Sequence, residues 1–421
     1  MKFTIYDLRF TILFLFILSP ILSHNYCAAE TTQFGSIISI NHPDKRVSNA
    51  SAIIDDEGRI YIGWVKEDGN KNNIYVASSS DNGKTFSEKV RVNGDADMPS
   101  GINHAPTMAL GTKGELYVAW TVSRTNGEFS SDIKFSRSLN KGKSFEPAIL
   151  VNDDNLPVSH GFESMTVAPD GSIYIAWLDG REKKEGVSST FIARSADNGK
   201  TFEKNVRVDG NSCPCCRTAV TVAHDGTVYV SWRKVFKPVP ADIKQGGDIR
   251  EIVLAKSTDK GKSFSESVVV GNDKWVIAGC PHRGPSISTD KDGFLYVVWY
   301  TEGETGSPAI YIANSKDGGM SFTKKLIPFS NGTFPDHPVM ALNRDGKPLI
   351  AWEETTPVLS RLIFQQTDEK PQQMNQGVRR AHDPVLSINK SGDILIAWSQ
   401  EEIRFTRTAY RLFRSQENIN H

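Results

Sequence analysis

The sequence has no excess of either charge and no tract of lysines and arginines. Its 421 residues carry 49 basic and 49 acidic side chains, so the formal net charge is zero. Nucleic acids and anionic membrane surfaces select basic patches or tails, so neither is expected as the main partner. Because 38 % of the residues are hydrophobic and 10 % aromatic, the chain can bury a large core and is not predicted to be disordered.

A long hydrophobic run is also missing. A membrane-spanning helix needs about 20 apolar residues, and the first apolar run, Ile12–Leu18, is much shorter. Lys2 and Arg9 precede it and two alanines follow near position 29, an order typical of a secretory signal peptide. We expect residues 1–29 to be removed on export to the periplasm or the extracellular space. Residues 30–421 then form a single domain with no transmembrane helix.

Cysteine is scarce, and its few positions are clustered. Of five cysteines, four remain after residue 29, and three of these stand in Cys213-Pro-Cys215-Cys216, with Cys280 as the fourth. Disulfide-stabilised domains spread their cysteines along the chain. The clustering indicates a local site instead.

What the sequence does have is a repeat. A short hydrophobic strand ending in tryptophan occurs seven times, at Trp64, Trp120, Trp177, Trp232, Trp299, Trp352 and Trp398. A period of about 50 residues indicates a circular or solenoidal array of similar units. Each unit reads as an inner strand such as Ser164–Ala168, a tight turn, the tryptophan strand, a third strand such as Thr190–Arg194, and a fourth strand. Four antiparallel strands per unit are typical of a propeller blade.

Five units carry the same box, Ser-x-Asp/Asn-x-Gly-x-Ser/Thr-Phe, between the third and fourth strands. The copies are Ser79–Phe86, Ser138–Phe145, Ser195–Phe202, Ser257–Phe264 and Ser315–Phe322. Asp and Ser/Thr can bond the turn backbone, Gly permits a left-handed conformation, and Phe anchors the hairpin. These boxes resemble the Asp-box (BNR) repeats of the sialidase-like superfamily. The resemblance implies a β-propeller in which the boxes are structural turns on the outer rim.

The two ends of the chain complete each other. The last unit ends near Tyr410–Ser415, which looks like a third strand with no fourth strand after it. Residues Phe34–Asn41 match the fourth-strand pattern of Phe86–Asn93. The sequence therefore predicts an all-β, seven-bladed propeller whose last blade takes its outer strand from the N-terminus, which removes two exposed sheet edges. The six-bladed sialidase type is the alternative.

Histidine and cysteine recur at one position of the repeat, 15 to 17 residues before the tryptophan or close to it. Inner-strand starts converge on the axis of a propeller, so we expect these side chains to meet at an axial mouth. Imidazole and thiolate are the ligands that copper and zinc prefer. The sequence predicts a transition-metal site there, copper first and zinc second, with Glu163, Asp336 and Asp383 as acceptors that orient the histidines. The candidate ligands are His104, His160, Cys213, Cys215, Cys216, Cys280, His282, His337 and His382.

Two other readings of these residues stay open. A histidine next to a proline is often only a polar loop cap. In an exported protein, accessible thiols oxidise. The second reading therefore pairs Cys280 with Cys213 or Cys216 in a disulfide, or Cys215 with Cys216 as a vicinal disulfide. One disulfide with two free thiolates is a mixed arrangement.

The resemblance also implies a second function, that of an exo-α-sialidase. Such enzymes bind a carboxylate with three arginines and use a tyrosine–glutamate nucleophile. Arg217 and Arg283 stand where two of the arginines would be, and Glu163 matches the glutamate. The family's Phe-Arg-Ile-Pro motif is absent, because that position reads Val47–Ser51, and no tyrosine occupies an inner-strand start in the late blades.

A third reading is a non-catalytic propeller that binds a glycan or a protein. In each case the expected partner is a small molecule or glycan at the axial mouth of a monomer. If the protein is an enzyme, thiolate–imidazole ligation favours metal-dependent redox chemistry over glycoside hydrolysis.

Overall fold

The computed structural model describes residues 33–40, 47–68, 71–94, 105–126, 129–184, 187–236, 247–375, 380–402 and 405–413. All of them belong to one compact unit, Gln33–His421. Every regular element in these residues is a β-strand, so the predicted all-β class is confirmed. None of the described residues form a helix with the length and hydropathy of a membrane span. The predicted signal peptide, Cys27 and His104 lie outside the described residues.

Three sheets contain four antiparallel strands each. Their strands are β2 (Val47–Ile54), β3 (Ile60–Asp68), β4 (Lys71–Ser79) and β5 (Val90–Arg91); β6 (Thr107–Leu110), β7 (Leu116–Ser123), β8 (Ser131–Ser138) and β9 (Ile149–Leu150); and β19 (Ser286–Thr289), β20 (Leu295–Thr301), β21 (Ala309–Ser315) and β22 (Thr323–Leu326).

Two larger sheets each join neighbouring strand sets through one residue pair. In the first, β13 meets β15 where Ser212 lies opposite Lys234, and in the second β25 meets β27 where Ser360 lies opposite Arg380. The first contains β10 (His160–Val167), β11 (Ile173–Lys184), β12 (Val187–Ser195), β13 (Val206–Ser212), β14 (Ala219–Val222), β15 (Val228–Phe236), β16 (Asp248–Ser257), β17 (Val268–Val269) and β18 (Val276–Ile277). The second contains β23 (Phe334–Leu342), β24 (Pro348–Thr355), β25 (Ser360–Gln366), β26 (Gln372–Gln373), β27 (Arg380–Ile388), β28 (Ile394–Glu402), β29 (Phe405–Phe413) and β1 (Ile38–Ile40).

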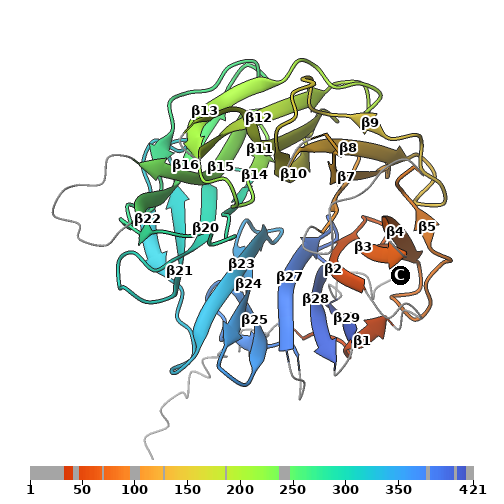
Figure 1. Cartoon of the computed structure of the whole chain (residues 1–421). Coiled ribbons are helices and arrows are strands. Elements are labelled where there is room, and N and C mark those ends of the chain that lie inside the picture. The colour runs from red at the N-terminus through yellow and green to blue at the C-terminus, as the bar shows by residue number, and fades with distance from the viewer. Residues whose placement is uncertain are drawn as a thin grey trace, which may run out of the picture. The chain divides into compact units, whose positions relative to one another are not determined.

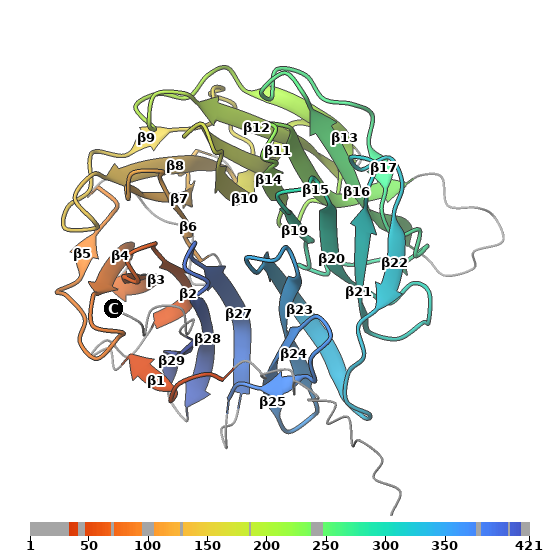
Figure 2. The ribbon, with the colours of Figure 1, turned by 180° about the vertical axis from the view of Figure 1, so that it is seen from behind.

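The sheets follow one another around a ring (Figures 1 and 2). Their first strands contact each other in chain order, β2, β6, β10, β14, β19, β23 and β27, and β27 in turn contacts β2. Near the ends of the chain, β1 pairs antiparallel with β29, with Ile38 opposite Tyr410 and Ile40 opposite Thr408. Side chains that precede or open the first strands therefore come together from distant parts of the sequence.

The seven tryptophans form the core between neighbouring sheets. Each lies inside its strand and not at the end that the sequence pattern predicts, as Trp64 does in β3, because the strand continues in pairing beyond the hydrophobic run. All seven are at most 2 % exposed. Trp64, for example, belongs to a cluster that joins β2–β4 to Leu395 and Ala397 of β28. Fully burying a large apolar side chain stabilises a fold by roughly 1.5–3 kcal/mol, so one tryptophan per unit fixes how successive sheets pack.

The boxes fold as the sequence predicts. In the first copy, Ser79 Oγ donates to Asp81 and accepts from the N–H of Gly83, and Asp81 also accepts from the N–H and Oγ1 of Thr85. Gly83 has a φ of 78°, and Phe86 packs against the core. The other copies repeat the serine-to-glycine bond and a positive φ at glycine.

Four first strands have a register shift near their starts, and that of β2 lies between Ser48 and Ser51. Strands β10, β23 and β27 pair with their neighbours beyond a register shift between Gly161 and Ser164, between Asp336 and Val339, and between His382 and Val385. At these shifts Phe162, His337 and Asp383 adopt positive φ. A β-bulge redirects side chains and is common beside functional sites, so several candidate residues lie on irregular strand, not on loops.

Candidate functional site

The most concentrated chemistry in the described residues is a cluster of three buried thiols. Cys213 Sγ lies 3.7 Å from Cys215 Sγ and 3.5 Å from Cys216 Sγ, and the three sulfur atoms all lie within 4.8 Å of one another. None of the four described cysteines is in a disulfide. We call Cys213, Cys215 and Cys216 the thiol cluster.

A tight turn between two strand sets builds this cluster. Strand β13 ends at Ser212, and the N–H of Cys213 then donates to the carbonyl of Arg233 in β15, at 2.8 Å. Pro214 fixes the backbone of the turn that follows, so three sulfurs close in sequence turn to the same interior. Apolar contacts with Val235, Phe162 and Val187 enclose them.

Positive charge borders the thiol cluster. Arg250 Nη1 donates to Cys213 Sγ at 3.2 Å. Hydrogen bonding with Cys215 and Cys216, together with the charge of Arg250, outweighs burial and lowers the pKa of Cys213. The hydrogen bond between Cys215 and Cys213 raises the pKa of Cys215, and burial raises that of Cys216. Of the three thiols, Cys213 is therefore the one that most readily loses its proton.

A second group of possible ligands overlaps the first. Ligand atoms of Cys215, Cys280 and His282 also lie within 4.8 Å of one another. Cys280 and His282 are exposed, whereas Cys215 is buried. The backbone of His282 has a φ of 56°, an uncommon conformation for a side chain of this size. Five of the candidate metal ligands are therefore brought together.

The segment that carries Cys280 and His282 is held against the thiol cluster. Arg233, which is 1 % exposed, donates to the carbonyl of Arg283 at 3.2 Å and to that of Tyr300 at 2.7 Å. Gly284 approaches the backbone of Arg217 closely. The ring of His282 lies 6.1 Å from that of Phe162, which itself packs on the thiols.

His160 lies in a different environment. It is fully buried, its Nδ1 lies 2.6 Å from the carbonyl of Ser131, and its Nε2 lies 3.1 Å from Asp154 and 3.6 Å from Asp179. Arg181 already binds both carboxylates, at 2.8 and 2.9 Å. A guanidinium in that position leaves no room for a cation, so this group is an ion-pair network.

His337 and His382 pair with carboxylates. His337 Nδ1 lies 3.3 Å from Glu353, and His382 Nδ1 lies 2.6 Å from Asp383. Burial opposes a charged ring, but Glu353 and Asp336 outweigh it and raise the pKa of His337 to about 9. A protonated imidazole offers no lone pair to a metal. The structure therefore does not bring His160, His337 and His382 into the group formed by the cysteines and His282.

Arg217 and Arg283 belong to a central charge cluster with Asp336, His337, Glu353, His382 and Asp383. Arg283 binds both carboxylate oxygens of Asp336 through Nε and Nη2, and its guanidinium lies over the ring of Tyr300. Arg217 Nη1 donates to Thr107 and to the carbonyl of Glu163, both at 2.9 Å. Both guanidinium groups are thus engaged within the protein.

Glu163, the third candidate catalytic residue, is 1 % exposed. Its Oε2 accepts from Thr121 Oγ1 at 2.9 Å, and its Oε1 is buried without a hydrogen-bond partner. The carbonyl of the same residue accepts from Arg217. Glu163 therefore ties β10 to β7 and to the segment before β14.

Sequence reasoning missed several residues that surround these sites. Arg233, Tyr300 and Glu353 each directly follow the tryptophan of their repeat unit. Because successive side chains of a strand point to opposite faces, the residue after each tryptophan points away from the tryptophan's side. A polar residue at that position of the repeat was a usable signal. Arg250 carries no comparable signal, since it lies in the third strand of its unit.

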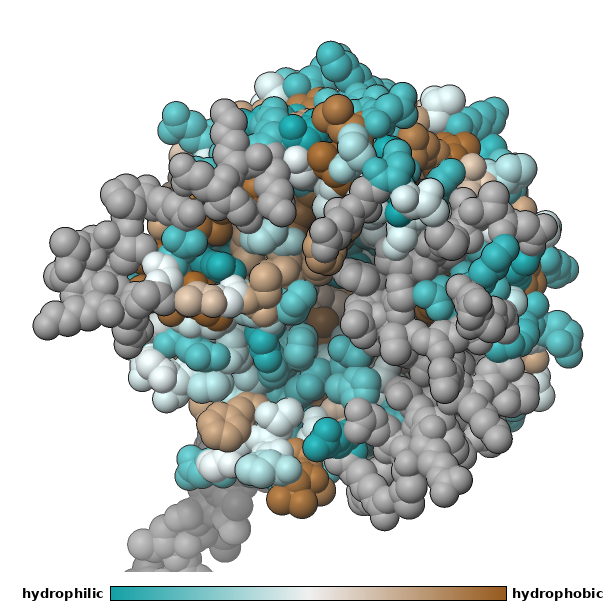
Figure 3. Space-filling view, viewed as in Figure 1, coloured by the Kyte–Doolittle hydropathy of each residue, from teal (hydrophilic) through white to brown (hydrophobic). Residues whose placement is uncertain are grey.

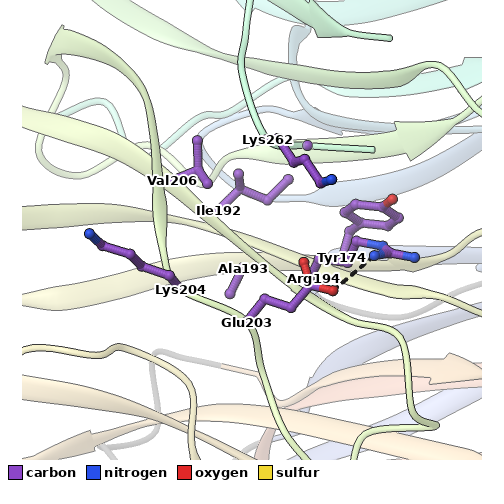
Figure 4. Close-up of a pocket in the computed structure, with 9 residues that line it drawn as sticks. Tyr174, Ile192, Ala193, Arg194, Glu203, Lys204, Val206 and Lys262 are labelled. Carbon is purple, nitrogen blue, oxygen red and sulfur yellow. Dashed lines mark hydrogen bonds and ion pairs between the residues drawn. The ribbon is translucent and has the colours of Figure 1, made fainter. Parts of the chain in front are cut away.

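Two pockets lie apart from these clusters. One is lined by Tyr174, Ile192, Arg194, Glu203, Val206 and Lys262, with an Arg194–Glu203 ion pair at 2.8 Å (Figure 4). A second, lined by Arg137, Glu146 and Lys200 among others, occupies the equivalent position of the preceding unit. Because equivalent residues of two successive units line the two pockets, both pockets result from the repeat and neither indicates a specific site. The face in Figure 3 is mostly hydrophilic at its described residues, with hydrophobic residues in small groups.

The sequence matches no protein-family model and no curated protein. Solved structures do share the fold. An ulvan lyase from a new polysaccharide lyase family has 13 % identity and a TM-score of 0.56, with 90 % of this chain and 96 % of that chain covered. The NanB sialidase of Streptococcus pneumoniae has 12 % identity and a TM-score of 0.50, with 77 % and 68 % covered.

An α-L-arabinanase of Penicillium chrysogenum, in complex with arabinobiose, is also similar, with 13 % identity and a TM-score of 0.51 over 74 % of this chain and 93 % of that chain. Identities this low show the fold alone. Together with the five boxes, they confirm that the chain folds as a sialidase-like β-propeller.

Proposed function

We propose that this protein is an exported propeller that binds a soft transition metal, copper before zinc, through the thiol cluster. The observation that carries the proposal is the convergence of three buried sulfurs within 4.8 Å of one another. The thiols are enclosed by apolar side chains, in which isolated thiolates are costly and metal-bound thiolates are not.

The separations of the sulfur atoms suit a single ion. Two thiolates bound at about 2.3 Å to one tetrahedral ion lie roughly 3.8 Å apart. The Sγ–Sγ distances of 3.7 and 3.5 Å are close to that value. Sulfur as the main donor favours monovalent copper, and the positive charges of Arg233 and Arg250 beside the sulfurs disfavour adding a divalent ion.

The finer architecture is part of the proposal. Seven blades, with β1 as the outer strand of the last blade, are supported by the β1–β29 pairing and by the contacts from β2 around to β27. Export of residues 30–421 is supported by the composition of residues 1–29. N-terminal sequencing of the mature protein checks the cleavage position.

Metal analysis of the protein as isolated, purified without chelator or a histidine tag, tests the proposed function. We expect near-stoichiometric copper or zinc, lost in a Cys213→Ser/Cys216→Ser variant. His224→Gln is the control, because His224 is exposed and outside every ligand group. Metal-free wild type that takes up neither ion after thiol reduction would exclude the function.

A glycan ligand at the central charge cluster is the second candidate. The similar solved structures are named for action on carbohydrates, and the cluster combines arginine, histidine and carboxylate side chains at the first-strand starts. Asp336 already occupies Nε and Nη2 of Arg283, so these atoms are not free to bind the carboxylate of a sialic acid. Binding of a glycan is therefore favoured over sialidase activity. Turnover of a fluorogenic sialoside, abolished by Arg283→Ala, would establish it.

A further inference from the structure

We propose that the site is built for two monovalent copper ions that share Cys215 Sγ as a bridging ligand. The inference rests on the proposed metal-binding function and adds its stoichiometry and ligand sets. One ion is bound by Cys213, Cys215 and Cys216, and the other by Cys215, Cys280 and His282.

The first argument is geometric. Two ligands of one ion, each about 2.3 Å away, can be at most about 4.6 Å apart. Each set of three satisfies a limit of 4.8 Å internally, but the five residues do not satisfy it together. One ion therefore cannot bind all five where they stand. Cys215 belongs to both sets, and a thiolate sulfur has enough lone pairs to bind two soft ions at once.

The second argument is charge. Four thiolates and two monovalent ions leave two negative charges in a largely buried site. Arg250 donates to Cys213 Sγ at 3.2 Å, and the buried Arg233 adds its charge beside Cys216. These two arginines balance the site. The nearby Glu251 is held by the N–H groups of Asp273 and Lys274. Two divalent ions would leave excess positive charge instead.

The third argument is that specific contacts hold the exposed ligands, Cys280 and His282, in place. Arg233 binds the carbonyl of Arg283, three residues from Cys280, and Gly284 permits close backbone contact with Arg217. His282 is held at positive φ beside Phe162. Cys280 and His282 are exposed while the thiol cluster is buried, so the outer ion site is open to solvent and the inner one is enclosed.

The experiment is anaerobic titration of the reduced, full mature protein with Cu(I), followed by removal of loosely bound ion and copper analysis. Copper K-edge X-ray absorption on the same sample reports sulfur ligation and copper–copper scattering. We expect two copper ions per wild-type chain with a copper–copper signal. A Cys280→Ser/His282→Gln variant, changed only at exposed positions, should keep one ion and lose that signal, whereas the control His224→Gln keeps both.

Each other outcome is decisive. One ion in wild type and in the Cys280→Ser/His282→Gln variant alike overturns the two-ion inference and leaves the proposed function standing. Two ions in both would place the second elsewhere and also overturn it. No copper in reduced wild type overturns both. Circular dichroism and thermal melting of each variant ensure that a lost ion is not a lost fold.

Discussion

Gly284 and Arg217 lie so close together that a Cβ on Gly284 would stand 2.0 Å from the carbonyl oxygen of Arg217. Arg217 follows the thiol cluster directly, and Gly284 ends the segment that carries Cys280 and His282. This single contact sets how near the two halves of the candidate metal centre can be.

Gly284→Ala should therefore separate the two halves. The backbone has to shift to relieve the clash, and overpacking of this kind costs about 1–3 kcal/mol. We expect a lower midpoint of urea unfolding and one copper ion lost on Cu(I) titration. Gly279→Ala is the matched control in the same segment, because its new Cβ would meet nothing nearer than Ile277 Cγ1 at 3.9 Å. Equal effects of the two changes would contradict the prediction.

Arg181→Met should destabilise the protein strongly. Arg181 neutralises Asp179, which is fully buried, and also binds Asp153 and Asp154. Removing one partner of a buried ion pair costs about 3–5 kcal/mol, which urea unfolding can measure.

The control for this change is Arg207→Met. Arg207 forms an ion pair with Glu182 in which both side chains are more than 40 % exposed, and such pairs contribute about 0–1 kcal/mol. A loss of similar size in the two variants would show that Asp179 does not depend on Arg181.

Stability should vary with pH through His337. Its pKa is about 9 in the fold against an ordinary 6.5, so the protonated ring stabilises the native state fully below about pH 6.5. That contribution is lost as the pH rises towards 9. Glu353, Asp336, Arg283 and Asp383 surround the ring and set the shift.

Two measurements check this prediction. An NMR titration of the histidine ring protons should place the midpoint of His337 well above 8, and thermal melting from pH 6 to 9 should show a decline that His337→Gln removes. His224→Gln, at an exposed position, should leave the decline unchanged. A midpoint near 6.5 would reject the ion pair with Glu353.

Gly199→Ala separates the two reasons for glycine in the boxes. Gly199 has a φ of 75°, and an added Cβ would lie 2.6 Å from Phe135 Cε1. We expect a loss of about 2–4 kcal/mol from left-handed strain and overpacking together. Gly226→Ala, with a φ of 86° and open space around it, should lose only the roughly 1–2 kcal/mol of strain. Indistinguishable unfolding curves would show that contact with Phe135 is unimportant.

The repeat was predictable because it is local. The Ser-Asp-Gly turn and its bonds act through neighbours a few residues away, and the structure has them where the pattern placed them. The tryptophans are where the repeat places them too, but each lies inside its strand and not at its end. The first strands were harder to place. Their pairing continues past a bulge at Glu163, at His337 and at Asp383. The residues at a bulge have no distinctive β-strand or turn propensity, so the sequence does not show where a bulge occurs.

The candidate site was only partly predictable for a similar reason. The candidate histidines and cysteines share one register of the repeat, yet His160, His337 and His382 each have a carboxylate within about 4 Å, whereas His282 lies beside thiols. The partners, such as Glu353 and Arg250, come from other strands. The position of a residue in the repeat predicts that its side chain lies near the axis, but it does not predict which charged side chain from another strand lies next to it.

The order of residues by itself determined the all-β class and the turns, because backbone periodicity and short-range hydrogen bonds act within a few residues. Only the folded ring decided that Cys280 and His282 meet Cys215, and that Arg283 binds Asp336. Those contacts join residues more than 50 positions apart, and their distances depend on how whole sheets pack around buried tryptophans.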